Sequence, residues 1–214
     1  AVGLICGQLI PPKTPLEFSE VFREAAADAY ERLIHPSLER ELRNELSDKA
    51  AQQAIHVFAL NLRQLLMQPP VKGKVTLGLD PAYRTGCKIA VVDETGRVLE
   101  TSVVYPTPPQ SKVEDAKRVL LNLMQKYRVT AIAIGNGTAS RESEQFVAEM
   151  LRESGISAAY MVVSEAGASV YSASKLAAEE FPDYDVSLRS AVSIARRLQD
   201  PLAELVKIDP KAIG

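Results

Sequence analysis

One acidic residue stands at the end of a short apolar stretch. Val75, Leu77 and Leu79 alternate with smaller residues up to Asp80, and Pro81 ends the stretch. A carboxylate at a strand end is well placed to ligate Mg²⁺, which prefers oxygen ligands. An Asp before Pro is also a common turn residue. Both interpretations of Asp80 stay open on its spacing alone.

The turn after this acid is basic. It carries Arg84, Thr85 and Lys88 around Gly86, and a second apolar stretch follows directly. Guanidinium and ammonium groups form strong charge-assisted hydrogen bonds with phosphate oxygens. We therefore expect Arg84, Thr85 and Lys88 to contact nucleic acid.

A nuclease metal pair, with ions roughly 3.5–4 Å apart, needs several acids. Glu165 follows a later apolar stretch and is the second candidate, although a first-turn acid at a helix dipole has the same pattern. The last long helix has no acid over residues 186–194, and Asp185 at its start is the nearest. We predict Asp80, Glu165 and Asp185 as catalytic candidates, with Asp80 and Glu165 as metal ligands. Because the third acid is displaced, we expect a degenerate site.

A glycine-containing segment, residues 135–141, follows another apolar stretch and opens a helix. Free N–H groups at a helix start favour anions. We predict contacts with nucleic acid from Asn136, Thr138, Ser140 and Arg141. The alternative is a plain turn with a Thr or Ser cap. The segment lacks the Lys of a nucleotide-binding phosphate loop, which argues against an ATPase.

Arg196 and Arg197 make the C-terminal helices locally basic. We predict that both contact nucleic acid. The alternative is that they complement the helix dipole or pair with Asp200 and Glu204.

The composition limits the class of protein. The 214 residues carry a net charge of −2, so any nucleic-acid binding needs a local basic patch. The two cysteines lack CxxC spacing, which indicates a reduced, cytoplasmic protein without a disulfide framework. No apolar run approaches the ~20 residues that cross a membrane, so we expect no membrane partner. Since the chain does not begin with Met, we expect a fragment of a longer protein.

The first 70 residues predict an all-helical segment. Helical periodicity runs over residues 14–68, with a break at His35-Pro36, because the residue before Pro avoids the α region. Ser47-Asp48 could cap a further helix, and the charge run at 39–49 indicates a solvated helix face. We place a domain boundary after Pro70, giving a helical segment at 1–70 and a second domain at 71–214.

The pattern after residue 71 predicts an α/β domain. We expect strands at 75–80, 87–93, 97–104, 130–134 and 158–163, and helices at 112–127, 140–153, 169–180, 186–199 and 201–207. Hairpin turns make the first three strands antiparallel, while the nearly all-apolar fourth strand is typical of parallel pairing. These elements predict an RNase H-like fold, with a five-stranded mixed sheet flanked by helices and preceded by the helical segment.

Five long motifs together resemble the Tex family of bacterial transcription accessory proteins. They are Gly-Leu-Asp-Pro-x-x-Arg-Thr-Gly-Cys-Lys at 78–88, Gly-Asn-Gly-Thr-Ala-Ser-Arg-Glu at 135–142, Ser-Glu-Ala-Gly-Ala-Ser-Val-Tyr-Ser-Ala-Ser at 164–174, Glu-Glu-Phe-Pro at 179–182 and the stretch 193–208. The resemblance covers the chain from about residue 15 to its end. It implies a YqgF domain, the RuvC-like branch of the RNase H fold, over residues 75–200, with 1–70 as part of a helical core.

The resemblance also implies a function and a site. Asp80 matches the strand-one acid, Glu165 matches the Glu of an Asp-Glu-Arg motif, and the third acid falls near Ser187, which is not acidic. Tex proteins are associated with transcription and with RNA or DNA binding, and not with an established enzymatic activity. We expect a nucleic-acid-binding or scaffold fragment that requires no cofactor, with the transcription machinery as a possible partner. The alternatives are a RuvC-like nuclease, which would need Mg²⁺ or Mn²⁺, and a protein-interaction module.

Overall fold

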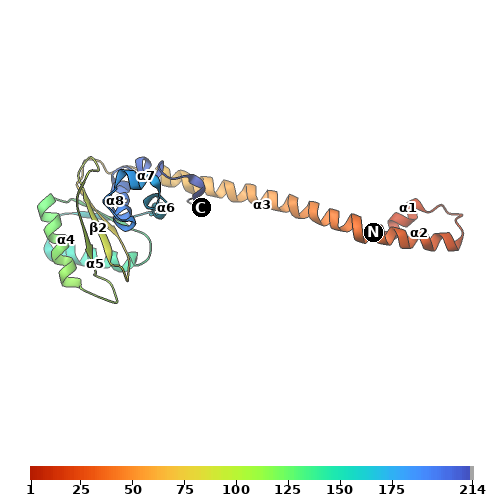
Figure 1. Cartoon of the computed structure of the whole chain (residues 1–214), viewed down its shortest axis with the longest axis horizontal. Coiled ribbons are helices and arrows are strands. Elements are labelled where there is room, and N and C mark those ends of the chain that lie inside the picture. Colours follow the sequence, from red (N-terminus) through yellow and green to blue (C-terminus); the bar gives the residue numbers. More distant parts are fainter. Residues whose placement is uncertain (213–214) are drawn as a thin grey trace. The chain divides into compact units, whose positions relative to one another are not determined.

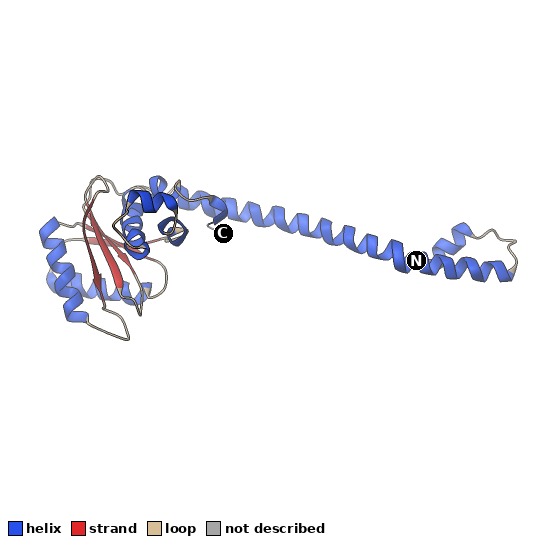
Figure 2. Cartoon of the chain, in the orientation of Figure 1, coloured by secondary structure: helices blue, strands red, loops and turns tan. Residues whose placement is uncertain are grey.

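The computed structural model describes residues 1–212 and divides the chain into two units, Ala1–Leu60 and a second that begins at Asn61. Figure 2 shows that the strands all belong to the second unit. The predicted boundary after Pro70 stays a prediction. None of the helices at residues 1–212 is both long and apolar enough to cross a membrane.

The first unit is helical, as predicted, but the predicted break at His35-Pro36 is wrong. Helices α1 (Val2–Leu9) and α2 (Leu16–Ala29) are followed by a π-helical turn, Tyr30–Ile34, and α3 (His35–Leu66) begins directly after it. The wider π turn changes the backbone hydrogen-bond pattern before Pro36, so the chain stays helical there. No new helix begins at Ser47 either.

The predicted solvated face of α3 is confirmed by its ion pairs. Arg43 pairs with Glu39 at 2.8 Å and Lys49 pairs with Glu45 at 2.7 Å, each across one helical turn. Such exposed pairs contribute only a few tenths of a kcal/mol, about 0.3–0.5 each. They keep this face in water rather than holding it against another element.

The sheet of the second unit has the predicted strands. They are β1 (Thr76–Asp80), β2 (Cys87–Val92), β3 (Val98–Val104), β4 (Ala131–Gly135) and β5 (Ala159–Val163), in the spatial order β3-β2-β1-β4-β5. The first three strands pair antiparallel, and β1, β4 and β5 run parallel. This confirms the predicted RNase H-like arrangement. Because β1, β4 and β5 are parallel, their carboxyl-terminal ends lie on the same side of the sheet.

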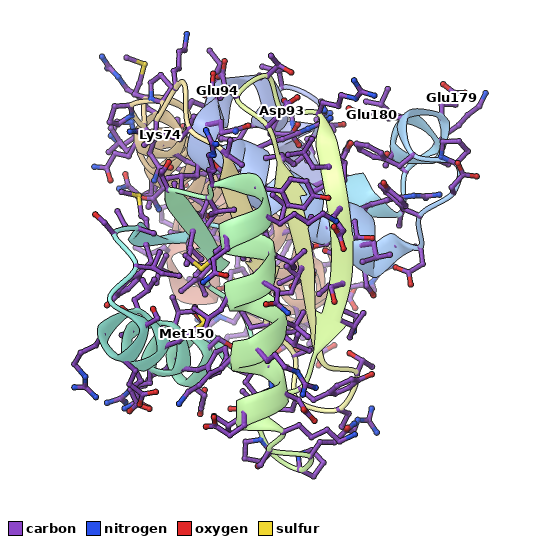
Figure 3. The ribbon with its side chains drawn as sticks, turned by 90° about the vertical axis from the view of Figure 1, so that its left-hand side faces the viewer. Lys74, Asp93, Glu94, Met150, Glu179 and Glu180 are labelled. Atoms are coloured by element: carbon purple, nitrogen blue, oxygen red, sulfur yellow. The ribbon has the colours of Figure 1, made fainter. Side chains whose placement is uncertain are left out.

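Two amphipathic helices cover one face of the sheet. They are α4 (Val113–Tyr127) and α5 (Ser140–Ser154), which lie together in Figure 1. Their buried residues, including Leu120 and Met150, pack on strand residues such as Leu77 and Ile132. Figure 3 labels Met150 on the α5 side of this layer. This is the larger of the two apolar layers of the domain.

Helix α8 (Val186–Gln199) covers the other face and approaches β1 closely. A Cβ at Gly78 would lie 2.3 Å from the carbonyl oxygen of Ala191 and 2.8 Å from Cβ of Ala195. Only glycine therefore allows this contact. At the far end of α8, the side chain of Gln199 donates to the carbonyls of Lys74 and Asp93, both at 2.8 Å and both labelled in Figure 3.

The C-terminal part forms short helices around α8. The helix predicted at 169–180 is two helices, α6 (Ala168–Ser172) and α7 (Lys175–Glu180), because Ser174 caps the second through its hydroxyl. Helix α9 (Pro201–Leu205) is capped by the carboxylate of Asp200 and is shorter than predicted. A 3₁₀ turn at Pro210–Ala212 follows it.

Candidate functional site

Asp80 lies at the end of β1, opposite Lys88 of β2, and is half-buried. Burial raises the pKa of its carboxyl group, and a hydrogen bond from the Ser190 hydroxyl and the charge of Lys88 only partly oppose this. A raised pKa in a carboxylate at a strand end is characteristic of functional sites. Asp80 is thus held by α8 on one side and by the β1–β2 hairpin on the other.

Glu165 follows β5, and its carboxylate lies against the backbone of the β4–α5 loop. A Cβ at Gly137 would lie 1.6 Å from Oε1 of Glu165, and a Cβ at Gly135 would lie 2.7 Å from Oε2. The Glu165 N–H donates to Oδ1 of Asn136 at 2.9 Å, and the Gly137 backbone hydrogen-bonds to the carboxylate. The two glycines, Gly135 and Gly137, therefore leave a space for the Glu165 carboxylate, which we call its seat. A Cβ at either position would fill this space.

The structure brings Asp80 and Glu165 together. Burial raises the pKa of Glu165, and the negative charge of Asp80 raises it further, while Gly137 and the charge of Arg197 oppose the shift. This acid pair, Asp80 with Glu165, is the juxtaposition that the parallel strands predicted.

The third predicted acid is elsewhere. The carboxylate of Asp185 caps α8 by accepting the Leu188 N–H at 2.8 Å, and it is exposed. Among residues 1–212, no group of three or more Asp, Glu, His or Cys side chains could hold a metal ion. Helix α8 presents Ser190 to Asp80 instead. The described residues around Asp80 and Glu165 do not fit the two-metal centre of a nuclease, since they supply no third carboxylate.

Lys88 lies inside the site rather than on its surface. Its side chain is buried at 8% exposure, and Nζ donates to the carbonyls of Thr85 at 2.7 Å and Gly86 at 2.9 Å. The predicted contact of Lys88 with nucleic acid stays a prediction. In the structure, the ammonium fixes the β1–β2 turn and supplies a positive charge to Asp80.

Arg197 is also internal, at 2% exposure. Its Nη1 donates to the carbonyls of Ser164 and Ala166, both at 2.8 Å, so it clamps the residues on each side of Glu165. Its Nε and Nη2 are buried and have no hydrogen-bond partner within residues 1–212. Its predicted contact with nucleic acid stays a prediction, and no local sequence pattern indicated this clamp.

Arg196 belongs to a second charged cluster, the ion-pair network of Tyr171, Glu180, Arg196, Glu204 and Lys207. Arg196 donates to the carbonyl of Gly96 at 2.7 Å and pairs with Glu180. Lys207 bridges Glu180 at 3.1 Å and Glu204 at 2.8 Å. Arg196 also lies 3.7 Å from Glu204, the partner named in the alternative interpretation of this residue.

The remaining predicted contact residues surround the acid pair on two loops. Arg84 and Thr85 are exposed on the β1–β2 turn, and Asn136, Thr138 and Arg141 are exposed on the β4–α5 segment, with Ser140 half-buried. We call these six residues the rim. The hydroxyl of Tyr83 donates to Glu142 at 2.9 Å, which joins the two loops.

The predicted Thr or Ser cap of α5 is absent. The N-cap is Ala139, which has a left-handed backbone with φ +63° and makes no side-chain hydrogen bond. Non-glycine residues seldom adopt this conformation. Just before this helix start, the Gly137 backbone hydrogen-bonds to the carboxylate of Glu165.

Residues 74–199, more than half of the chain, match the family described as "Tex protein YqgF-like domain". The chain belongs to the Tex family. It is 56% identical over 182 residues to "Transcriptional accessory protein Tex" of Neisseria gonorrhoeae, covering 85% of this chain and 24% of the relative. It is 45% identical over 203 residues to human "S1 RNA-binding domain-containing protein 1", covering 92% of this chain and 20% of the relative.

The Tex relatives are much longer than this chain, which spans between 20% and 27% of the length of the curated relatives it matches. Among solved structures, "Thermus thermophilus RuvC structure" is similar to 61% of this chain and 96% of its own, with a TM-score of 0.43 and 19% identity.

Proposed function

We propose that this Tex fragment binds nucleic acid through the rim around the acid pair and does not cleave it. The observation that carries the proposal is the composition of the site. Asp80 and Glu165 lie close enough for their charges to interact, and the nearby α8 side chain is the hydroxyl of Ser190 rather than a third carboxylate. A site of this kind at the strand ends retains the surrounding loops that can bind a nucleic acid. It lacks the carboxylate ligands that metal-assisted hydrolysis needs.

The rim supplies groups that suit a phosphate backbone. Arg84 comes from the β1–β2 turn and Arg141 from the first turn of α5, and both are exposed, while Asn136 and Thr138 add neutral hydrogen-bond donors. Phosphate contacts of this kind position a nucleic acid without reading its sequence. Lys88 and Arg197 lower the negative potential of the acid pair beneath the rim, which otherwise would repel phosphates.

The names of the relatives agree with this proposal. One relative is a transcriptional accessory protein and another contains an S1 RNA-binding domain by its name. We propose that the longer protein acts on transcription in the cytoplasm, and that this domain adds a contact to nucleic acid or to the transcription machinery. The choice between RNA and DNA is part of the test.

A second candidate function is a metal-dependent nuclease that uses the acid pair. It is favoured by the raised pKa of both carboxyl groups and by their proximity, since Mg²⁺ in enzymes often takes only one or two carboxylates and keeps several waters. In this case purified protein with Mg²⁺ or Mn²⁺ should cut branched or single-stranded substrates, and the Asp80→Asn variant should not.

The test of rim binding uses the chain with labelled single-stranded RNA and DNA in fluorescence anisotropy. Arg84→Ala combined with Arg141→Ala should weaken binding roughly tenfold and reduce the slope of log K against log salt by about 1–2. The matched control is Arg118→Ala with Arg152→Ala, two exposed arginines on α4 and α5 outside the rim. Equal losses in both variants, or none in either, would contradict the proposal.

A further inference from the structure

The acid pair is one ligand short of a metal centre, and the structure identifies the position that is missing. Asp80 and Glu165 come from the ends of β1 and β5, and α8 crosses the same face of the sheet. Ser190 directly precedes Ala191, whose carbonyl packs on Gly78 of β1, and its hydroxyl lies close enough to the Asp80 carboxylate to favour the charged form. Ser187, the position expected from the family resemblance, lies almost one turn earlier on the helix.

The close packing of α8 fixes this assignment. Gly78 lets the backbone of Ala191 sit directly on β1, where a Cβ would lie 2.3 Å from the Ala191 carbonyl oxygen. Ser190 is the residue next to this contact, and Asp80 is two residues beyond Gly78 on the strand. A rotation or slide of the helix that brought another residue to Asp80 would disturb this close packing on Gly78.

The structure also shows what balances the charge of the pair. The Lys88 ammonium is buried and held by the carbonyls of Thr85 and Gly86, and the Arg197 guanidinium is held by the carbonyls on both sides of Glu165. Both cations are fixed by backbone groups, so neither can leave to make room for an ion. The Glu165 carboxylate, in turn, is committed to the seat formed by Gly135 and Gly137.

We propose that residue 190 determines whether this site holds a divalent cation, and that Ser190, with Lys88 and Arg197 as fixed positive charges, keeps the acid pair free of metal. The inference rests on the proposed lack of cleavage, and it assigns that lack to one position. A neutral hydroxyl beside Asp80 supplies neither the negative charge nor the strong oxygen ligand that a third carboxylate would give a cation. A carboxylate at 190 would instead add an oxygen ligand and a negative charge, which the two fixed cations do not balance.

The experiment measures Mn²⁺ binding to the full 214-residue chain by the loss of the free-ion signal in electron paramagnetic resonance. We expect the unaltered chain to bind Mn²⁺ weakly, without a saturable site. Ser190→Asp should gain a saturable site about tenfold or more tighter, in the range by which single groups around a metal change affinity. The matched control, Ser187→Asp, adds the same charge to the same helix and should gain no such site. Ser190→Asp combined with Asp80→Asn should lose it.

A second variant keeps the test decisive if Ser190→Asp does not fold. Lys88→Met removes one fixed cation but retains the apolar stem, and it should also strengthen Mn²⁺ binding. Tight saturable binding by the unaltered chain would overturn the proposal, as would equal gains in Ser187→Asp and Ser190→Asp, or no gain in either Ser190→Asp or Lys88→Met. The result is independent of nucleic-acid binding, so a failure here is distinguishable from a failure of the rim variants.

Discussion

The two charged clusters of the sheet domain differ in how their acids are paired. In the ion-pair network, Glu180 accepts hydrogen bonds from Tyr171, Arg196 and Lys207, which together bring its pKa below the ordinary value although burial alone would raise it. In the acid pair, burial raises the pKa of Asp80 and Glu165, and neither carboxylate has a direct ion pair. The network therefore stabilises the fold. The acid pair costs stability and retains a charge pattern typical of a functional site.

The largest expected effect lies in the network. Glu204 is buried at 3% exposure and accepts from Ser193 at 2.9 Å and Lys207 at 2.8 Å. Glu204→Ala removes one of the two acids that balance Arg196 and Lys207 and leaves the Ser193 hydroxyl without its acceptor, so it should destabilise the domain by about 3 kcal/mol in urea unfolding followed by circular dichroism.

The control for this variant is Glu179→Ala. Glu179 is next to Glu180 on α7, as labelled in Figure 3, but it is exposed and makes only a 3.6 Å pair with Lys175. Its replacement should change stability by less than about 0.5 kcal/mol. Similar effects of the two variants would show that the network is no more important than a surface pair.

An intermediate effect is expected at the seat of Glu165. The added Cβ of Gly137→Ala would overlap the Glu165 carboxylate, so that side chain must move. We expect a loss of about 1–2 kcal/mol, and a much smaller loss when Gly137→Ala is introduced into a Glu165→Ala background. The thermodynamic cycle of four proteins measures this coupling. A coupling free energy near zero would show that Gly137 and Glu165 do not depend on one another.

The smallest effect has the opposite sign. Because the pKa of Asp80 is raised in the folded state, folding favours its protonated form and the charged form destabilises the domain at neutral pH. Asp80→Asn should therefore stabilise the domain by about 0.5–1 kcal/mol at pH 7.

This gain depends on pH in a defined direction. It is fully present above the folded-state pKa of Asp80, shrinks as the pH falls through that pKa, and disappears only below the ordinary value of 3.8, where the carboxyl is protonated in both states. Thermal unfolding of both proteins between pH 7 and pH 4 measures the trend. A destabilised Asp80→Asn variant at pH 7 would mean that the Asp80 charge contributes to stability, as the charges of the network do.

The contrast also explains what the sequence could predict. The juxtaposition of Asp80 and Glu165 followed from strand directions, because Asp80 ends one apolar strand, Glu165 lies just past the end of another, and parallel strands have their carboxyl ends on the same side of the sheet. The strands themselves were clear from short apolar runs bounded by turns. The π turn at Tyr30–Ile34 left no such trace, because it changes hydrogen bonding without changing the apolar pattern.

The long-range contacts were less predictable. Whether Ser187 or Ser190 meets Asp80 depends on the rotation of α8, which the distant Gly78 determines. Similarly, the roles of Arg196 and Arg197 depend on partners such as Glu180 and the carbonyl of Ser164, which come from other elements. Local patterns identify a helix with two arginines at its end. They do not show which way those arginines point.

The most direct test of the account compares the unaltered chain with Asp80→Asn, each incubated with a labelled single strand in the presence of Mg²⁺, with binding and cleavage measured in the same samples. The account predicts that both proteins bind with equal affinity, or that Asp80→Asn binds slightly more tightly because it removes a negative charge, and that neither cuts the strand. Cleavage or Mg²⁺-dependent binding by the unaltered chain that is lost in Asp80→Asn would contradict it.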